Sequence, residues 1–302
     1  MFGNIVEIAQ EGRHLAVDRG LLVVCEGEQE CGRIPLDTIE AVILSARQVS
    51  LTRPVMAALA AHDALVVVCD ANYAPTSILA PYADNFEAGK RMRAQARAST
   101  PLGKRLWKLL VQRKLHNQAT VLAWHRPDSP KAHKLHLLAK AVRSGDTGNA
   151  EGQGARLYWR ALLGPTFVRD PERQDCNTLF NYAYTVLRTA VARSIVGAGL
   201  HPALGVHHHN RSNAFALADD MMEPYRPLAD HVVLEVLQAD TDARLTPPVK
   251  RQLAAVLQHP VQHEDTTIPL YQGLHHVALG IARSYTGGKV CVPLPEIRLG
   301  VT

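Results

Sequence analysis

This sequence lacks CxxC motifs, an even set of closely spaced cysteines and long apolar runs. The five cysteines, Cys25, Cys31, Cys69, Cys176 and Cys291, are scattered along the chain, which argues against a disulfide framework and against a zinc ribbon. No apolar run approaches the ~18–20 residues that a membrane-spanning helix needs, and the chain does not open with a charged segment followed by an apolar one. We therefore expect no membrane association and a reducing, cytoplasmic location.

Three catalytic fingerprints are missing as well. The sequence has no Ser-His-Asp nucleophile elbow, no glycine-rich P-loop lysine and no Rossmann glycine pattern, so neither acyl transfer nor ATP hydrolysis is indicated. What the chain does have is 302 residues, of which 47% are hydrophobic, enough for a well-buried core and for two domains. Its formal net charge of +5 permits a nucleic acid partner.

The spacing of apolar residues changes near residue 82. Before this point, short β-branched segments separated by glycines or charged turns predict strands. The expected strands cover residues 5–10, 14–27 with a turn at Arg19-Gly20, 31–36, 40–45 and 65–70. After this point a spacing of 3.6 residues predicts helices. The sequence therefore predicts an α+β protein with an N-terminal β-rich domain, an antiparallel meander over residues 1–82, and an all-α C-terminal domain over residues 83–302.

The first helical stretch is strongly basic. From Lys90 to Lys114 it contains nine lysines and arginines and no acidic residue, and such an imbalance repels itself unless a polyanion neutralises it. A DNA or RNA phosphate backbone would do so. The alternative is an amphipathic helix whose basic face is simply solvated, because leucines and Trp107 recur at helical spacing.

A second stretch, residues 145–164, combines an acid with glycines and arginines. Thr147 or Asn149 can cap a helix that carries Glu151 in its first turn. Gly152 and Gly154 each cost roughly 1 kcal/mol relative to alanine inside a helix, so we expect another part of the molecule to approach this backbone closely. The neighbouring Tyr158 and Trp159 could stack on a base or fill the core, and for Trp159 the core is favoured.

A third stretch, residues 199–230, gathers side chains that bind metal ions. Three consecutive histidines, His207 to His209, precede Asp219, Asp220 and Glu223. On a helix, carboxylates three or four residues apart share one face, and on a half-buried helix they repel one another unless a cation compensates. Pro224 should end or kink this helix. The alternative is that the acids lie on a solvated face and the histidines form a polar turn.

Together these stretches resemble a known family. The matching motifs are Glu151-Gly152-x-x-Ala155-Arg156-x-Tyr158-Trp159, Leu204-Gly205-x-x-His208 and Asp219-Asp220-x-x-Glu223-Pro224-Tyr225-Arg226-Pro227. Their order is similar to that of the CRISPR-associated endonuclease/integrase of antiviral defence, the larger of the two universal spacer-acquisition proteins. The segment HHHNRSNAFALADDMMEPYRP is most similar to the version found in type II systems.

The resemblance implies roles for individual residues. It implies that Glu151, His208 and Glu223 are catalytic and bind Mg²⁺ or Mn²⁺. Asp219 and Asp220 are additional or outer carboxylates near the metal, and His207 and His209 are rival candidates for the histidine. The candidates for DNA contact are Lys90, Arg91, Arg93, Lys104, Arg105, Lys108, Arg156, Tyr158, Arg160 and Arg211.

The resemblance also implies partners and an activity. The β-rich domain would form a homodimer, and two dimers would flank a dimer of the smaller adaptation protein while binding double-stranded spacer precursor and CRISPR repeat DNA. One imidazole with two or three carboxylates suits Mg²⁺ or Mn²⁺ better than structural zinc. The predicted activity is metal-dependent transfer of DNA 3′-OH ends onto a phosphodiester of the repeat. The alternatives are a stand-alone nuclease on branched DNA and a non-catalytic DNA-binding scaffold with a structural ion.

Overall fold

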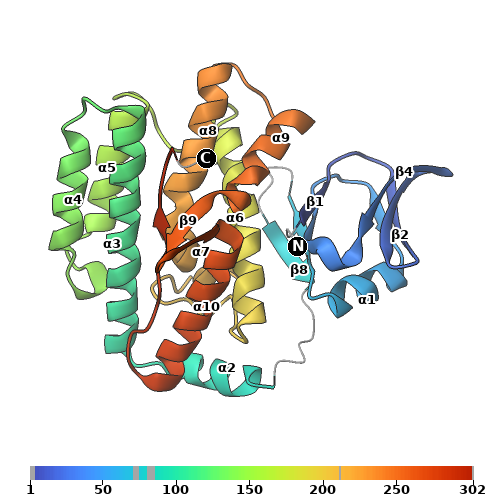
Figure 1. Cartoon of the computed structure of the whole chain (residues 1–302), viewed down its shortest axis with the longest axis horizontal. Coiled ribbons are helices and arrows are strands. Elements are labelled where there is room, and N and C mark those ends of the chain that lie inside the picture. Colours follow the sequence, from blue (N-terminus) through green and yellow to red (C-terminus); the bar gives the residue numbers. More distant parts are fainter. Residues whose placement is uncertain (1–3, 71–74, 80–85, 211, 301–302) are drawn as a thin grey trace. The chain divides into compact units, whose positions relative to one another are not determined.

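The computed structural model of the chain describes residues 4–70, 75–79, 86–210 and 212–300. The chain falls into two compact units, Met1–Asn85 and Phe86–Thr302 (Figure 1). The first unit is rich in strands and the second in helices, so the predicted α+β class is confirmed. The expected boundary between residues 82 and 83, and the DNA-contact candidate Arg211, lie outside the described residues.

The N-terminal unit contains two four-stranded sheets, with strand orders β4-β3-β2-β6 and β1-β5-β7-β8. Its elements are β1 (Asn4–Ile8), β2 (Arg13–Asp18), β3 (Leu21–Glu26), β4 (Gln29–Pro35), η1 (Leu36–Thr38), β5 (Ile39–Leu44), β6 (Val49–Leu51), α1 (Arg53–Ala61), β7 (Leu65–Cys69) and β8 (Pro75–Leu79). The predicted turn at Arg19-Gly20 joins β2 to β3, and both residues have positive φ, 48° and 78°. Leu15, Leu22, Val42 and Leu59 from both sheets and α1 share one core.

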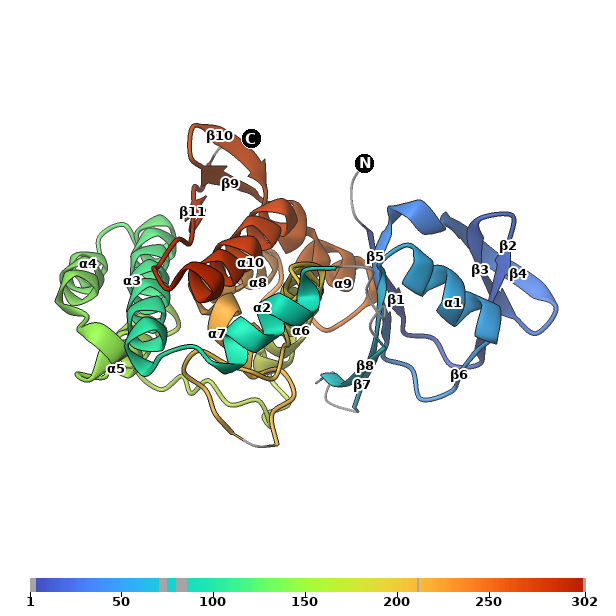
Figure 2. The same cartoon turned by 90° about the horizontal axis from the view of Figure 1, so that it is seen from below.

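The prediction of a purely antiparallel meander is wrong. The pairs β1–β5, β5–β7 and β2–β6 are parallel. Figure 2 shows β1 and β5 side by side. Between β5 and β7 the chain passes through β6 and α1, and such a crossover lets the next strand run in the same direction as the first. A period of two indicates which side chains share a face of a sheet, but it carries no information on strand direction.

The C-terminal unit is mainly helical. Its helices are α2 (Ala88–Ala96), α3 (Thr100–His125), α4 (Lys131–Ala141), η2 (Ser144–Asp146), α5 (Ala150–Leu162), α6 (Asn177–Gly197), α7 (Ala216–Met222), η3 (Glu223–Tyr225), α8 (Arg226–Ala239), α9 (Pro247–Ala254), η4 (Ala255–Gln258) and α10 (Leu270–Gly287). None of the helices within the described ranges combines the length and the apolar character that crossing a bilayer requires.

The prediction of an all-α domain is wrong for one small sheet. Its strands are β9 (Pro260–His263), β10 (Thr266–Pro269) and β11 (Glu296–Ile297), in the order β10-β9-β11. In this sheet Val261 pairs with both Ile268 and Ile297. These strands have only two to four residues, and β11 lies beyond α10 in the chain. Strands this short leave no recognisable period in the sequence.

Helix α3 organises the C-terminal unit. It packs against α4, α5, α8 and η3, and its neighbours α4 and α5 lie beside it in Figure 1. The apolar core between them includes Leu110, Leu115, Tyr158 and Leu162. The expected close approach to the α5 backbone is found at Gly154, where an added Cβ would overlap the Leu115 side chain. A glycine at this position lets α5 lie directly against α3.

We expect Gly154→Ala to lower the free energy of unfolding by roughly 1–3 kcal/mol, because the new methyl group has to displace Leu115 in a close-packed core. Gly287→Ala is the matched control, since it lies at the end of α10 with no heavy atom within 4 Å of an added Cβ. This control should be neutral or stabilise by up to about 1 kcal/mol. Urea unfolding followed by circular dichroism measures both, and equal stabilities would contradict the packing argument.

Candidate active site

Glu151 is held at the start of α5 by two capping side chains. Asn149, with φ 52°, accepts a hydrogen bond from the backbone N–H of Gly152 at 3.1 Å. The Asp146 carboxylate accepts from the N–H groups of Ala150 and Glu151 at 2.8 and 2.9 Å. Of the two predicted caps, Asn149 rather than Thr147 is therefore the one used. These bonds fix the backbone of Glu151 in the first helical turn.

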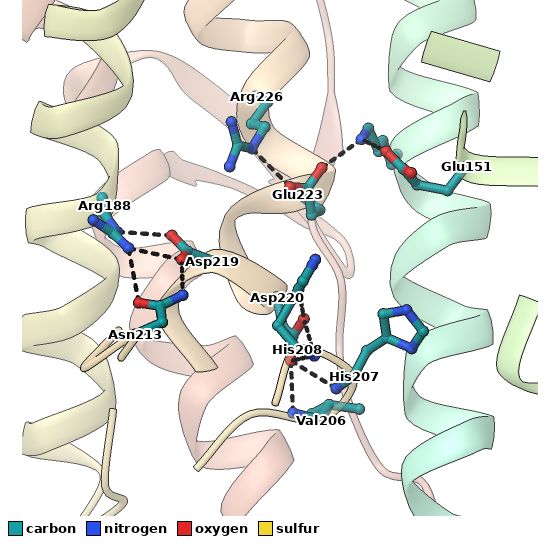
Figure 3. Close-up of polar contacts among 11 residues, drawn as sticks. Glu151, Arg188, Val206, His207, His208, Asn213, Asp219, Asp220, Glu223 and Arg226 are labelled. Carbon is teal, nitrogen blue, oxygen red and sulfur yellow. Dashed lines mark hydrogen bonds and ion pairs between the residues drawn. The ribbon is translucent and has the colours of Figure 1, made fainter. Parts of the chain in front are cut away.

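Lys114 of α3 joins Glu151 to Glu223. Its ammonium donates to Oε1 of Glu151 and, at 2.5 Å, to Oε2 of Glu223. Figure 3 shows the Glu151 and Glu223 side chains extending toward each other from α5 and η3. Lys114 belongs to the basic run for which the sequence predicts a face turned to a polyanion or to solvent, but its side chain is only 7% exposed. The two acids thus neutralise this lysine, and no polyanion is needed to do so.

The charge of Glu223 is stabilised from a second side. Burial alone would raise the pKa of its carboxyl, but Arg226, with Nε 2.8 Å from Oε1, and Lys114 lower it to about 2. Burial would likewise lower the pKa of Lys114, and the carboxylates of Glu223 and Glu151 raise it above its ordinary value. Both groups therefore stay ionised across the physiological pH range.

Asp220 organises the loop that carries the histidines. It is fully buried, and its carboxylate accepts from the backbone N–H groups of Val206 and His207 at 2.6 and 2.8 Å, and from Nδ1 of His208 at 2.5 Å (Figure 3). An added Cβ at Gly205 would overlap the carbonyl oxygen of His208 and lie 2.9 Å from Asp220. The Leu-Gly-x-x-His spacing therefore reflects a tight loop wrapped around one carboxylate.

The hydrogen bond to Asp220 also sets the state of His208. This bond raises the pKa of the imidazole despite its partial burial. Because Nδ1 faces Asp220, Nε2 is the ring nitrogen that can bind a metal or a substrate atom. Asp220 thus lies behind His208 as an orienting group, and its oxygen atoms are already committed to the loop.

The other candidates of this stretch lie apart from Glu151 and Glu223. Asp219 forms an ion pair with Arg188, 2.7 Å from Nε, and accepts from Asn213 at 2.7 Å (Figure 3). The ring of His207 stacks on Trp107 at 4.3 Å between centroids with an interplanar angle of 1°. His209 is exposed. The Asp219 carboxylate is thus already paired with Arg188 of α6, and its role as an additional or outer carboxylate stays a prediction.

The candidates for DNA contact fall into three groups. Lys90, Arg93, Lys104, Arg105, Arg156 and Arg160 are exposed, whereas Arg91 and Lys108 are half-buried. Two of these have protein partners: Lys90 lies 3.3 Å from Glu87, and Arg91 donates to the carbonyl of Ala198 at 3.0 Å. Tyr158 is fully buried, so its prediction as a DNA contact is wrong. Trp159 packs on Phe167 and Phe180, as the favoured core interpretation predicts.

The donor atoms suit a hard divalent cation, although they are not gathered around one point. Among the described residues, no three His, Cys, Asp or Glu side chains lie close enough to hold an ion together. However, carboxylate oxygens of Glu151 and Glu223 converge on a single cation, the Lys114 ammonium. Two carboxylates with a nearby imidazole are ligands that Mg²⁺ and Mn²⁺ accept. The residues present therefore fit such an ion.

A second buried carboxyl lies behind Arg226. The hydroxyl of Tyr184 donates to Oδ1 of Asp230 at 2.5 Å, and the Arg226 guanidinium lies 4.7 Å from the centre of the Tyr184 ring. Burial raises the pKa of Asp230 to about 7, despite the bond from Tyr184 and the nearby charges of Arg169 and Arg226. Sequence patterns gave no indication of this cluster, because its members come from three separate segments.

The raised pKa of Asp230 makes stability depend on pH. Its carboxyl binds a proton more tightly in the folded than in the unfolded chain, so wild type loses stability relative to Asp230→Asn as pH rises from about 4 to about 7. The full difference is on the order of 4 kcal/mol at most. Urea unfolding of both proteins at pH 4.5, 6.0 and 7.5 measures it, and a pH-independent difference would contradict the assignment.

Comparison with known proteins agrees with this architecture. The family model described as CRISPR associated protein Cas1 matches residues 6–244. A CRISPR-associated endonuclease Cas1 of Neisseria meningitidis serogroup C (strain 8013) is 39% identical over 258 residues, covering 85% of this chain and 84% of the relative. A CRISPR-associated endonuclease Cas1 2 of Pyrobaculum aerophilum is 29% identical over 293 residues, covering 92% and 98%.

Solved structures share the fold. A casposase bound to integration product has a TM-score of 0.82 at 19% identity and covers 100% of this chain and 96% of its own. A Cas1 protein from Thermotoga maritima has a TM-score of 0.74 at 15% identity, covering 95% and 98%. Cas1 proteins are generally metal-dependent, and a solved Cas6-RT-Cas1–Cas2 complex has a TM-score of 0.76 at 20% identity, covering 98% of this chain and 36% of its own. By sequence and by fold, the chain belongs to the Cas1 family, the endonucleases and integrases of CRISPR spacer acquisition.

Proposed function

We propose that Glu151, His208 and Glu223 hold a Mg²⁺ or Mn²⁺ ion with which this chain joins the 3′-OH ends of spacer DNA to the CRISPR repeat. The observation that carries this proposal is the convergence of Glu151 and Glu223, from separate helices, on one buried cation. The bound ion would polarise a phosphodiester and lower the pKa of the attacking hydroxyl. If the attacking group is water instead, the product is a nick.

The protein side of this chemistry follows from the contacts. Arg226 and Lys114 keep the Glu223 carboxylate ionised, so it can act as a ligand without first losing a proton. Asp220 holds the His208 ring through Nδ1 and leaves Nε2 for the ion. The exposed Lys104 and Arg105 on the first turns of α3 are suited to bind phosphates near the reacting ends.

The partners are part of the same proposal. We infer that the N-terminal unit forms a homodimer, that the C-terminal unit is catalytic, and that the chain works with Cas2 on double-stranded DNA. A solved Cas6-RT-Cas1–Cas2 complex supports the association with Cas2, and a solved casposase bound to integration product supports the action on DNA. Five free cysteines are consistent with a reducing, cytoplasmic compartment.

The proposal is tested by joining a labelled duplex with free 3′-OH ends to a supercoiled plasmid that contains the repeat, with Mn²⁺, Mg²⁺ or chelator and with or without Cas2. Glu151→Ala, His208→Ala and Glu223→Ala should each reduce joining at least about a hundredfold, and Asp220→Asn about 10–100-fold, because it only orients His208. His133→Ala is the matched control, since it removes an exposed histidine of α4 that is not a candidate ligand.

Each other outcome has a meaning. Full activity of His208→Ala combined with an inactive His207→Ala or His209→Ala would move the ligand role to that histidine. Nicking without joining by the wild type would indicate a nuclease on branched DNA, and metal binding without either reaction would indicate a scaffold. Joining that does not depend on Cas2 would contradict the proposal that the chain works in a complex with Cas2.

The salt dependence of DNA binding tests the exposed basic residues. Lys104→Ala and Arg105→Ala should each weaken duplex binding and flatten the slope of log affinity against log salt concentration by ~0.9 per lost phosphate contact. Lys289→Ala, an exposed lysine beyond α10, removes the same charge elsewhere and should leave the slope unchanged. Fluorescence anisotropy measures the affinity for duplex DNA at salt concentrations from about 50 to about 300 mM. If Lys104→Ala and Arg105→Ala have the same slope as wild type and Lys289→Ala, the two residues do not contact DNA phosphates.

A further inference from the structure

Lys114 is unusual because its charge is buried beside that of Glu223, one of the proposed ligands. Its side chain is 7% exposed, and that of Glu223 is 9% exposed. Lys114 lies between the apolar Val111 and Leu115 on the buried face of α3. An ammonium in such surroundings is stable only when carboxylates accept its protons, and Glu151 and Glu223 do so here.

The charges of this cluster balance without any further ion. Lys114 and Arg226 supply two positive charges, and Glu151 and Glu223 supply two negative charges. A divalent cation added to these four residues would give the set a net charge of +2. Uncompensated buried charge costs several kcal/mol per ion, so a cation that enters between the two carboxylates must compete with the ammonium that already lies there.

We propose that the Lys114 ammonium holds the place of the divalent cation between Glu151 and Glu223, and that metal binding displaces it. This inference rests on the proposed function, because it takes these two glutamates as ligands. The lysine holds the two carboxylates close together before the metal binds. The flexible four-carbon stem of lysine allows the ammonium to swing away without movement of α3. Metal binding at this site is therefore an exchange of one cation for another.

The exchange predicts a measurable effect on metal affinity in the absence of DNA. Lys114→Met and Lys114→Gln should bind Mn²⁺ at least about tenfold more tightly than wild type, because the competing charge is gone. Without metal, both variants should melt at a lower temperature than wild type, since Glu151 and Glu223 then repel each other, and Mn²⁺ should raise their melting temperature more than that of wild type. Isothermal titration calorimetry and thermal unfolding measure these effects.

Lys250→Met is the matched control. Lys250 is also a buried lysine, on α9, with its ammonium 5.3 Å from the centre of the Tyr182 ring. Its removal should leave the Mn²⁺ affinity within about threefold of wild type, within the ordinary scatter of remote substitutions. Glu151→Ala tests the ligand assignment on which the inference depends, and it should lose Mn²⁺ binding in both the wild-type and the Lys114→Met backgrounds.

A measurement on the wild-type protein covers the case in which the variants do not fold. Reductive methylation followed by peptide mass spectrometry reports the accessibility of each lysine, and Mn²⁺ should raise the methylation of Lys114 severalfold while that of Lys250 stays unchanged. Unchanged labelling of Lys114 would overturn the displacement. Equal Mn²⁺ affinities of wild type and Lys114→Met would also overturn it. In either case, loss of Mn²⁺ binding by Glu151→Ala would leave the proposed function standing. Mn²⁺ binding by Glu151→Ala as tight as that of wild type would instead remove the ligand assignment itself.

Discussion

The ion-pair cluster of Lys114, Glu151, Glu223 and Arg226 is the constraint on which the C-terminal unit depends. Its members come from α3, α5, η3 and α8, so the helices can bury their apolar faces only in an arrangement that also brings these charges into contact. A buried charge without a partner is strongly destabilising. The requirement for pairing thus fixes how α5 and α8 lie against α3, and the same contacts gather the acids that the proposed chemistry needs.

Three acids that are close in sequence serve three different purposes. Asp219 pairs with Arg188 on α6, Asp220 holds the histidine loop, and Glu223 faces Lys114 and Arg226. Asp219 and Asp220 lie in α7, and Glu223 begins the short helix η3. The three side chains are close in sequence but reach partners on different elements, and only Glu223 pairs with Lys114 at the candidate site.

Family membership gives these contacts their meaning. In an endonuclease and integrase of spacer acquisition, the site has to bring a phosphodiester and a hydroxyl close to an acidic cluster, and negative charges repel one another unless cations are present. Lys114 and Arg226 pair with the Glu223 carboxylate inside the protein. The exposed lysines and arginines of α3 and α5 add positive charge at the surface, and positive charge of this kind attracts the phosphates of DNA.

The sequence alone determined the α+β class, the turn at Arg19-Gly20, the capped start of the Glu151 helix and the close approach at Gly154, because each depends on neighbouring residues or on a local period. It could not determine the parallel strand pairs or the β9–β11 sheet, which arise from contacts between distant segments. It also counted Lys114 in a basic run expected to face a polyanion or solvent, made Tyr158 a candidate for DNA contact and grouped Asp219 with Glu223. Only the tertiary structure decided these cases, because the partner of a charge or a ring is set by which helices pack together, and spacing along one helix does not contain that information.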